Sequence, residues 1–251
     1  MAAPGANPRP APEDLHPALW RAHQLGRQRE AGWASGFAEL DAVLPGAGWP
    51  ARALTELLLA HPGIGEMRLL CPVLAAVQQQ QRSVILFDPP ALPFASALAA
   101  CGLDLQQLYV VRSHAAQRGR AGGPLPAADI LWALEQSLAS GQVGALLAWL
   151  PARLAADSLR RLQLAAQAHD GPAFLLREEA ARLRPSPAPL RLLLRPAGPD
   201  ELRLQLLKRR GPPLARPLTL ALAPVLAPAL RARALRSSAL PARSEAPGAL
   251  A

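Results

Sequence analysis

Residues 53–70 read ALTELLLAHPGIGEMRLL, and this stretch decides the fold class of the 251-residue chain. Its first eight residues, 53–60, are almost wholly apolar, which is typical of a strand buried on both faces. The loop HPGIG follows and leads into a helix predicted over residues 66–80. A strand, a loop with glycines and a helix in this order predict the first half of a βαβ unit.

The same alternation continues along the chain. Further strands are predicted at residues 83–88, 108–112, 143–150 and 172–177, and helices at 93–102, 126–140 and 152–169. The links between them are short, so we expect crossovers and a mainly parallel sheet with helices on both faces. After residue 188 the runs PLRLLLRP, ELRLQLLKRR and RPLTLAL partly alternate, which predicts an antiparallel extension of this sheet. The predicted fold class is therefore α/β.

Four segments are expected from composition and periodicity. Residues 1–14 are rich in proline and alanine and are predicted to be disordered. Residues 15–32 begin with LHPALWRAHQLGRQ, a short amphipathic helix that either docks on a partner or packs on the chain's own core. Residues 33–223 form the predicted core, and residues 224–251 form a basic Ala/Pro/Arg tail that is also predicted to be disordered.

Charge is distributed unevenly along the chain. Residues 1–176 carry 13 basic and 13 acidic side chains, whereas residues 177–251 carry 14 basic and 5 acidic ones. Lys208 is the single lysine among 27 basic residues, so the rest are arginines. The whole excess of +9 thus lies in the last third, where it suits nucleic acid or an acidic protein partner.

Several classes of protein are excluded by the sequence pattern. No apolar run reaches the roughly 18 to 20 residues of a membrane helix, and the N-terminus lacks the pattern of a secretory signal. Cys71 and Cys101 stand alone and the five histidines are scattered, so we expect reduced thiols and neither a zinc site nor a disulfide. No side-chain grouping indicates nucleophilic or acid–base catalysis. These features predict a cytoplasmic protein without a metal.

Four tryptophans matter for the predicted surface and core. Trp132 lies in an apolar helix pattern and Trp149 in an apolar strand pattern, so both are predicted to pack in the core rather than to stack on bases. Trp49 borders a turn and is predicted, with Trp20, to contact a partner.

The loop after the first strand has the layout of a P-loop but not its chemistry. Glu66 stands where a P-loop lysine meets the phosphates, and Met67 stands where a Ser/Thr would hold magnesium. Ala60 replaces the first glycine, while Gly63 and Gly65 remain. Because a carboxylate repels phosphate, we predict a degenerate nucleotide loop.

A family resemblance starts in the same region. The segment SGFAELDAVLPGAGWPARALTELLLAHPGIGE, residues 35–66, resembles the opening of the RecA core. Together with LHPALWRA and the strand end FDPP, it makes residues 15–222 most similar to the ImuA family. These are RecA-like accessory proteins of bacterial translesion synthesis, related to the SulA division inhibitors. The resemblance implies a RecA-like core.

The resemblance also implies that the groups which hydrolyse ATP in RecA are missing. The Asp-x-Glu at a strand end corresponds to Asp88-Pro89-Pro90, so the glutamate is absent. The Walker B aspartate would fall at Ala148 or Trp149, and the sensor glutamine at about Arg177. Phosphoryl transfer needs positioned charge, magnesium and an oriented water. We therefore expect no ATPase activity and no cofactor.

The DNA-binding loops of RecA correspond to shorter segments here. The first becomes Pro151-Ala152-Arg153, and the second becomes residues 178–189, where Arg182 and Arg184 are candidates for weak nucleic-acid contact. Lys208-Arg209-Arg210 corresponds to a Lys-x-Lys that reaches across the RecA filament interface. We expect this triplet to dock on RecA as a filament end-cap, or else to be a solvated basic strand end.

The function that the resemblance implies is a non-catalytic adaptor in SOS-induced, error-prone translesion synthesis. Its implied partners are RecA, ImuB and, through ImuB, an error-prone replicative-type polymerase at the nucleoid of damaged cells. Trp20 and Arg21 of the N-terminal helix and the basic last third are the expected contacts. Two alternatives are a SulA-like inhibitor of cell division and an active RecA-like DNA-dependent ATPase.

Overall fold

The architecture comes from a computed structural model, which describes residues 32–112, 127–211, 214 and 216–224. The strands of the described part are β1 (Leu54–Leu59), β2 (Ser83–Phe87), β3 (Leu108–Val111), β4 (Val143–Leu150), β5 (Ala173–Glu178), β6 (Leu190–Gly198), β7 (Glu201–Lys208) and β8 (Leu218–Ala221). The helices are α3 (Ala38–Asp41), α4 (Glu66–Gln79), α5 (Ala95–Ala100), α6 (Ala127–Ala139) and α7 (Ala156–Gln167), with 3-10 turns η1 (Leu105–Gln107) and η3 (Glu179–Leu183).

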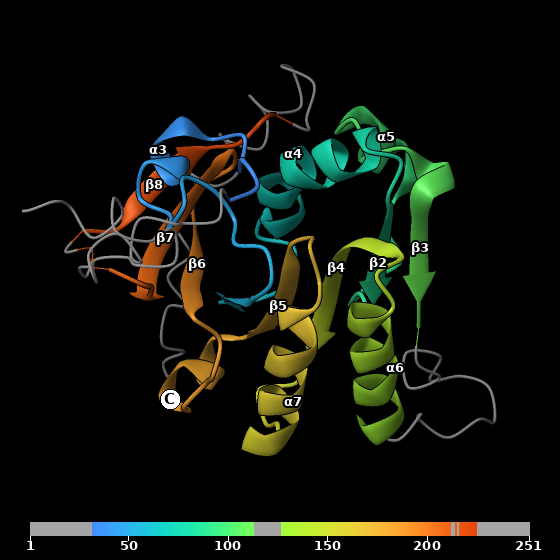
Figure 1. Ribbon diagram of the computed structural model, residues 1–251. Helices are drawn as coiled ribbons and strands as arrows, with labels where there is room; N and C mark the ends of the chain where they lie inside the picture. Colours follow the sequence, from blue (N-terminus) through green and yellow to red (C-terminus); the bar gives the residue numbers. More distant parts are fainter. Residues whose placement is uncertain (1–31, 113–126, 212–213, 215, 225–251) are drawn as a thin grey trace, which may run out of the picture.

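The eight strands form one sheet in the order β3-β2-β4-β5-β1-β6-β7-β8 (Figure 1). Strands β1 to β6 pair in parallel, and β7 and β8 continue the sheet in antiparallel. Helices α4 and α5 lie on one face, and α6 and α7 on the other (Figure 1). The predicted α/β class, the mainly parallel sheet and its antiparallel extension are confirmed.

The core is divided by the sheet into two layers. All six residues of β1 are buried because β5 and β6 flank the strand and helices cover both its faces. Leu57 and Leu59 point into the cluster that includes α4, whereas Leu54 points into the cluster of α6 and α7. Leu58 packs under η3 with Ala181 and Leu193. A mostly apolar strand is therefore what this central position in the sheet requires.

The segment before β1 closes the core beside α3. Trp33 and Trp49 form an antiparallel bridge, and a Cβ at Gly48 would lie 2.4 Å from the carbonyl oxygen of Trp33, so only glycine fits there. Trp49 is fully buried and its ring meets Phe174 edge-on at 5.2 Å. The prediction that Trp49 contacts a partner is wrong, because the bridge turns its side chain inward.

Other predictions on segments and tryptophans have different outcomes. The segments 1–14 and 225–251 and nearly all of 15–32 lie outside the described residues, as do Trp20 and Arg21. Trp132 is 63% exposed, so its predicted place in the core is wrong. The side of α6 that faces the sheet carries Leu131, Leu134 and Leu138 instead.

In the described part of the chain, no helix is long and apolar enough to cross a bilayer.

Candidate functional site

The candidate site lies where the parallel strands end, which is where open α/β sheets bind their ligands. Strand β1 ends at Leu59, the loop 60–65 follows, and α4 begins at Glu66 as predicted. Gly63 and Gly65 have φ values of 84° and 112°, in the left-handed region that glycine tolerates. This backbone turns successive N–H groups toward the helix N-terminus and forms a concavity suited to an anion.

That concavity holds a side chain of the protein itself. The carboxylate of Glu66 accepts hydrogen bonds from Gly63 N–H at 2.8 Å and from Gly65 N–H at 3.1 Å. Glu66 is buried, so the contact is shielded from water. Sequence reasoning predicted that this carboxylate would repel phosphate. In the structure, the Glu66 carboxylate also occupies the position of a phosphate and accepts the hydrogen bonds that a phosphate would need.

The other residues around the loop make contacts within the protein. Ala60 is exposed at the end of β1, and Met67 packs against the hydrophobic core instead of facing the loop. Arg68, one residue on, donates to Asp200 at 2.9 Å and to the Pro199 and Ala223 carbonyls, which fixes the first turn of α4 to the β6–β7 hairpin. The loop is therefore held in one shape by its own helix and by the hairpin.

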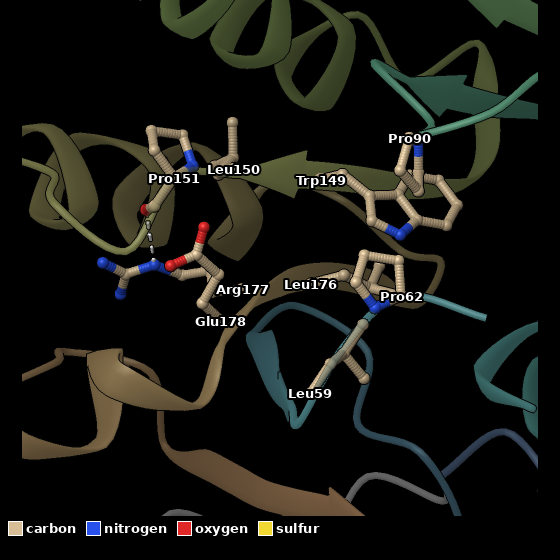
Figure 2. A pocket seen from close by; sticks show the side chains of 9 residues that line it. All are labelled: Leu59, Pro62, Pro90, Trp149, Leu150, Pro151, Leu176, Arg177 and Glu178. Atoms are coloured by element: carbon tan, nitrogen blue, oxygen red, sulfur yellow. Dashed lines mark hydrogen bonds between the residues drawn. The ribbon is translucent and has the colours of Figure 1, made fainter. Parts of the chain in front are cut away.

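A small cavity of about 190 Å³ opens beside this loop at the strand ends (Figure 2). Its lining is mostly apolar and consists of Leu59, Pro62, Pro90, Trp149, Leu150, Pro151, Leu176, Arg177 and Glu178. Ligand pockets usually measure about 300 Å³ or more, so the cavity is small for a nucleotide. Among the described residues, no three His, Cys, Asp or Glu side chains gather as metal ligands do.

Arg177 belongs to a buried cluster that the sequence prediction missed. Its guanidinium pairs with Glu56 of β1 and donates to the Ala152 carbonyl. It also donates to the Pro151 carbonyl, the contact drawn as a dashed line in Figure 2. Arg191 of β6 donates to the second Glu56 oxygen and to the Ala181 carbonyl. The side chains of Glu56, Arg177 and Arg191 are 0%, 1% and 9% exposed. This triad joins the three neighbouring strands β5, β1 and β6.

The basic triplet Lys208-Arg209-Arg210 begins with the last residue of β7, and its side chains differ in exposure. Lys208 is exposed and its Nζ donates to the Ser186 carbonyl at 2.9 Å. Arg209 is partly buried and donates to the Val43 carbonyl beside α3. Arg210 is exposed. Alternation along the strand end sends Arg209 inward, so Lys208 and Arg210 are the exposed members of the triplet.

The segment predicted as the second DNA loop is partly ordered into η3. Arg182 is exposed and lies 3.5 Å from the carboxylate of Glu179. Arg184 is exposed directly after η3. Neither arginine has a contact with Glu66, whose carboxylate is held by the loop N–H groups of Gly63 and Gly65.

The two cysteines are neighbours in space although no motif links them in the sequence. Burial and the adjacent thiol of Cys101 raise the pKa of Cys71 to about 12. Both thiols are free, as predicted, with Cys71 buried and Cys101 partly buried. Cys71 lies on α4 and Cys101 directly follows α5, and these helices share one face of the sheet, a relation that spacing in the sequence does not reveal.

Comparison with known proteins gives one informative match. Over 121 residues the chain is 31% identical to the cell division inhibitor SulA of Edwardsiella piscicida. The matched region covers 48% of this chain and 65% of that relative, so the chain spans slightly less than two thirds of the protein it matches. No family model matches the chain. The likeness supports a distant relation to SulA and, at most, a place in the group of ImuA and SulA proteins.

The triad could have been noticed in the sequence. Glu56 interrupts the apolar run LTELLLA, Arg177 ends FLLR, and Arg191 lies within PLRLLL. A charged residue inside a buried strand needs a partner of opposite charge. One acid and two bases on three candidate core strands were therefore a signal for a buried ion cluster.

Proposed function

We propose that the protein acts in the bacterial SOS response by binding other proteins, without hydrolysing ATP. The observation that carries the non-catalytic part is the Glu66 carboxylate, which already accepts the loop N–H groups that would hold phosphate. The relation to SulA supports the SOS part.

The positions where the RecA resemblance places catalytic groups serve other purposes here. Trp149 lines the small cavity and packs against the core. Arg177 is engaged by Glu56, and Asp88 is followed by two prolines with no second carboxylate. These positions therefore offer no lysine, no carboxylate for magnesium and no residue to orient a water, which supports a protein that does not hydrolyse ATP.

Exposed apolar side chains support a role in protein binding. Of the ten large hydrophobic residues exposed in the described part, six lie between residues 92 and 111: Leu92, Phe94, Leu105, Tyr109, Val110 and Val111. This stretch includes β3, which is an edge strand of the sheet. Apolar surface gathered at an open sheet edge is typical of a protein interface.

Inhibition of cell division is the specific function that the comparison favours. The matched relative is a division inhibitor, and it shares 121 aligned residues with this chain. In this form of the proposal, the protein accumulates after DNA damage and blocks septum formation by binding the tubulin-like septum protein.

The adaptor of translesion synthesis is the second candidate, and a different observation favours it. The segments LHPALW and SGFAELDAVLPGAGWP, at residues 15–20 and 35–50, resemble ImuA proteins. In this form, RecA, ImuB and the polymerase recruited by ImuB are the partners, with DNA contacted weakly if at all.

One experiment in the native bacterium separates the two candidates. The protein is overproduced without DNA damage and cell length is measured; in parallel, the gene is deleted and ultraviolet-induced mutation frequency is measured. Filamentation without loss of mutagenesis supports the division inhibitor, and loss of mutagenesis without filamentation supports the adaptor. An unchanged result in both assays would contradict an SOS role.

Nucleotide binding is tested on the purified protein. Equilibrium titration with ATP and magnesium is expected to give no saturable binding. Tight, magnesium-dependent binding would overturn the proposed role of Glu66 as the occupant of the loop. The variant Arg160→Glu changes a charge on the exposed side of α7, away from the loop, and should give the same titration as the wild type.

A further inference from the structure

One face of the antiparallel extension carries charged and polar side chains without a covering helix. Along β7, Leu202, Leu204 and Leu206 are buried on the α4 side, whereas the alternating residues on the other side are exposed. We call this exposed side, together with the adjoining turn η3, the basic face. Its members in the described chain are Arg182, Leu183, Arg184, Arg195, Glu201, Arg203, Gln205, Leu207, Lys208 and Thr219.

Like charges are placed directly opposite each other on this face. Arg195 of β6 pairs in register with Arg203 of β7, an arrangement that costs stability unless an anion lies nearby. Glu179 of η3 supplies one carboxylate, and its hydrogen bond to Arg195 holds the pKa of Glu179 below its usual range. Among the described residues, no ion pair of Arg203 is found.

A β-bulge adds a further positive charge to the same face. The register places Leu206 opposite Leu192 but Lys208 opposite Arg191, so Leu207 is the extra residue. Because Arg191 points toward Glu56, its partner Lys208 points to the same side and reaches Ser186. The face therefore bears five cations against two carboxylates, Glu179 and Glu201.

Apolar groups lie among these charges. Leu183 at the end of η3 is 81% exposed, and Leu207 at the bulge is 37% exposed. A solvated basic surface has no need of exposed leucines, whereas a protein interface combines apolar contacts with a charged rim. The chain contains no Phe, Tyr or Trp after residue 174, so this region has no ring on which bases could stack.

We propose that the basic face docks an acidic segment of a partner protein, with an apolar side chain of that segment packing on Leu183. The carboxylates of the segment neutralise Arg184, Arg203 and Lys208. The inference rests on the proposed role in protein binding and applies equally to a division partner and a repair partner.

The test measures binding of three fluorescent probes by anisotropy: a peptide of alternating glutamate and leucine, poly-glutamate, and an oligothymidylate. The purified full-length chain is compared with the double variant Arg184→Glu/Arg203→Glu. The mixed peptide is expected to bind most tightly and to lose affinity about ten-fold or more in the double variant, because each reversal turns an attraction into a repulsion. Raising NaCl from about 50 to about 300 mM should also weaken binding.

Controls separate the chemistry of the face from its fold. Arg160→Glu makes one such charge reversal on α7, where Asp157 is its neighbour, and should leave peptide binding unchanged. Leu183→Ser should weaken the mixed peptide and leave poly-glutamate unaffected. The altered side chains are exposed, so Arg160→Glu and Leu183→Ser should keep the wild-type urea midpoint. The double variant should keep or slightly exceed it, because Arg203→Glu places an opposite charge across from Arg195.

Three results would overturn the proposal. In the first, the protein binds oligothymidylate more tightly than the mixed peptide, and the double variant loses this binding. In the second, the double variant binds the mixed peptide as well as the wild type does. In the third, the wild-type protein binds neither acidic probe. Such results leave the cell-length and mutagenesis readouts intact, so failure of the basic face is distinguishable from failure of the proposed function.

Discussion

Replacing Glu56 with alanine tests the buried triad more directly than any other single change. The substitution leaves two guanidinium groups facing each other in a space almost closed to water, with side chains 1% and 9% exposed. Arg177 keeps its two carbonyl partners and Arg191 keeps one, but neither keeps a counter-charge. The folded state then bears the desolvation cost of the charges without the attraction that offset it.

The expected cost is about 3 to 5 kcal/mol in the free energy of unfolding, the range for removing one member of a buried ion pair. Domains of this kind are stable by about 5 to 15 kcal/mol, so the variant should lose a large part of its stability. Arg191, at 9% exposed, is nearer the surface and can partly reach water, which favours the lower end of the range.

Urea denaturation followed by circular dichroism measures this free energy from the midpoint and slope. The matched control replaces all three charges at once, with Glu56→Leu, Arg177→Leu and Arg191→Met. It should be more stable than Glu56→Ala alone, because no buried charge remains without a partner. A cost below about 1 kcal/mol for Glu56→Ala, or a triple variant less stable than the single one, would refute the account.

Two further predictions concern the loop and a buried imidazole. Glu66→Ala leaves the Gly63 and Gly65 N–H groups without their acceptor, so it should lower the free energy of unfolding by about 1 to 3 kcal/mol. Added phosphate should raise the melting temperature of this variant but not of the wild type, because only the variant has free N–H groups in the loop. Burial, assisted by the positive charge of Arg82, lowers the pKa of His169 from 6.5 to about 4. This contribution to stability should therefore be full above pH 6.5, fall by up to about 3 kcal/mol between pH 6.5 and 4, and level off below pH 4, where both states bind the proton. His169→Asn should flatten this part of a stability–pH profile.

The fold could be predicted because its signals are local. Apolar runs, short links and the loop at residues 61–65 placed every strand of the described sheet within a few residues of its observed bounds. The β4 prediction at 143–150 matches the structure at both ends. Such signals depend on neighbours in the sequence, which is why they could be interpreted without knowledge of strand order.

For the candidate site, the sequence predicted which residues are present in the loop but not how their side chains are arranged. The sequence indicated that Glu66 opposes phosphate, yet its turn back onto the loop N–H groups depends on the φ values of Gly63 and Gly65. The triad joins residues separated by 121 and 135 positions, so only the sheet order brings them together. Trp132 was misplaced because apolar neighbours on α6 do not fix which side of the helix it occupies.

The positions of the two candidate contact surfaces bear on the choice between inhibitor and adaptor. The apolar stretch 92–111 includes edge strand β3, whereas the basic face lies on β6 to β8 at the other end of the sheet. Seven strand spacings of about 4.8 Å place the two edges about 34 Å apart. One surface is apolar and the other is cationic, so they suit partners of different chemistry that need not compete. An inhibitor of one target requires a single contact, whereas an adaptor requires at least two. If charge reversal on the basic face abolishes one association and leaves a second intact, the adaptor becomes the better account.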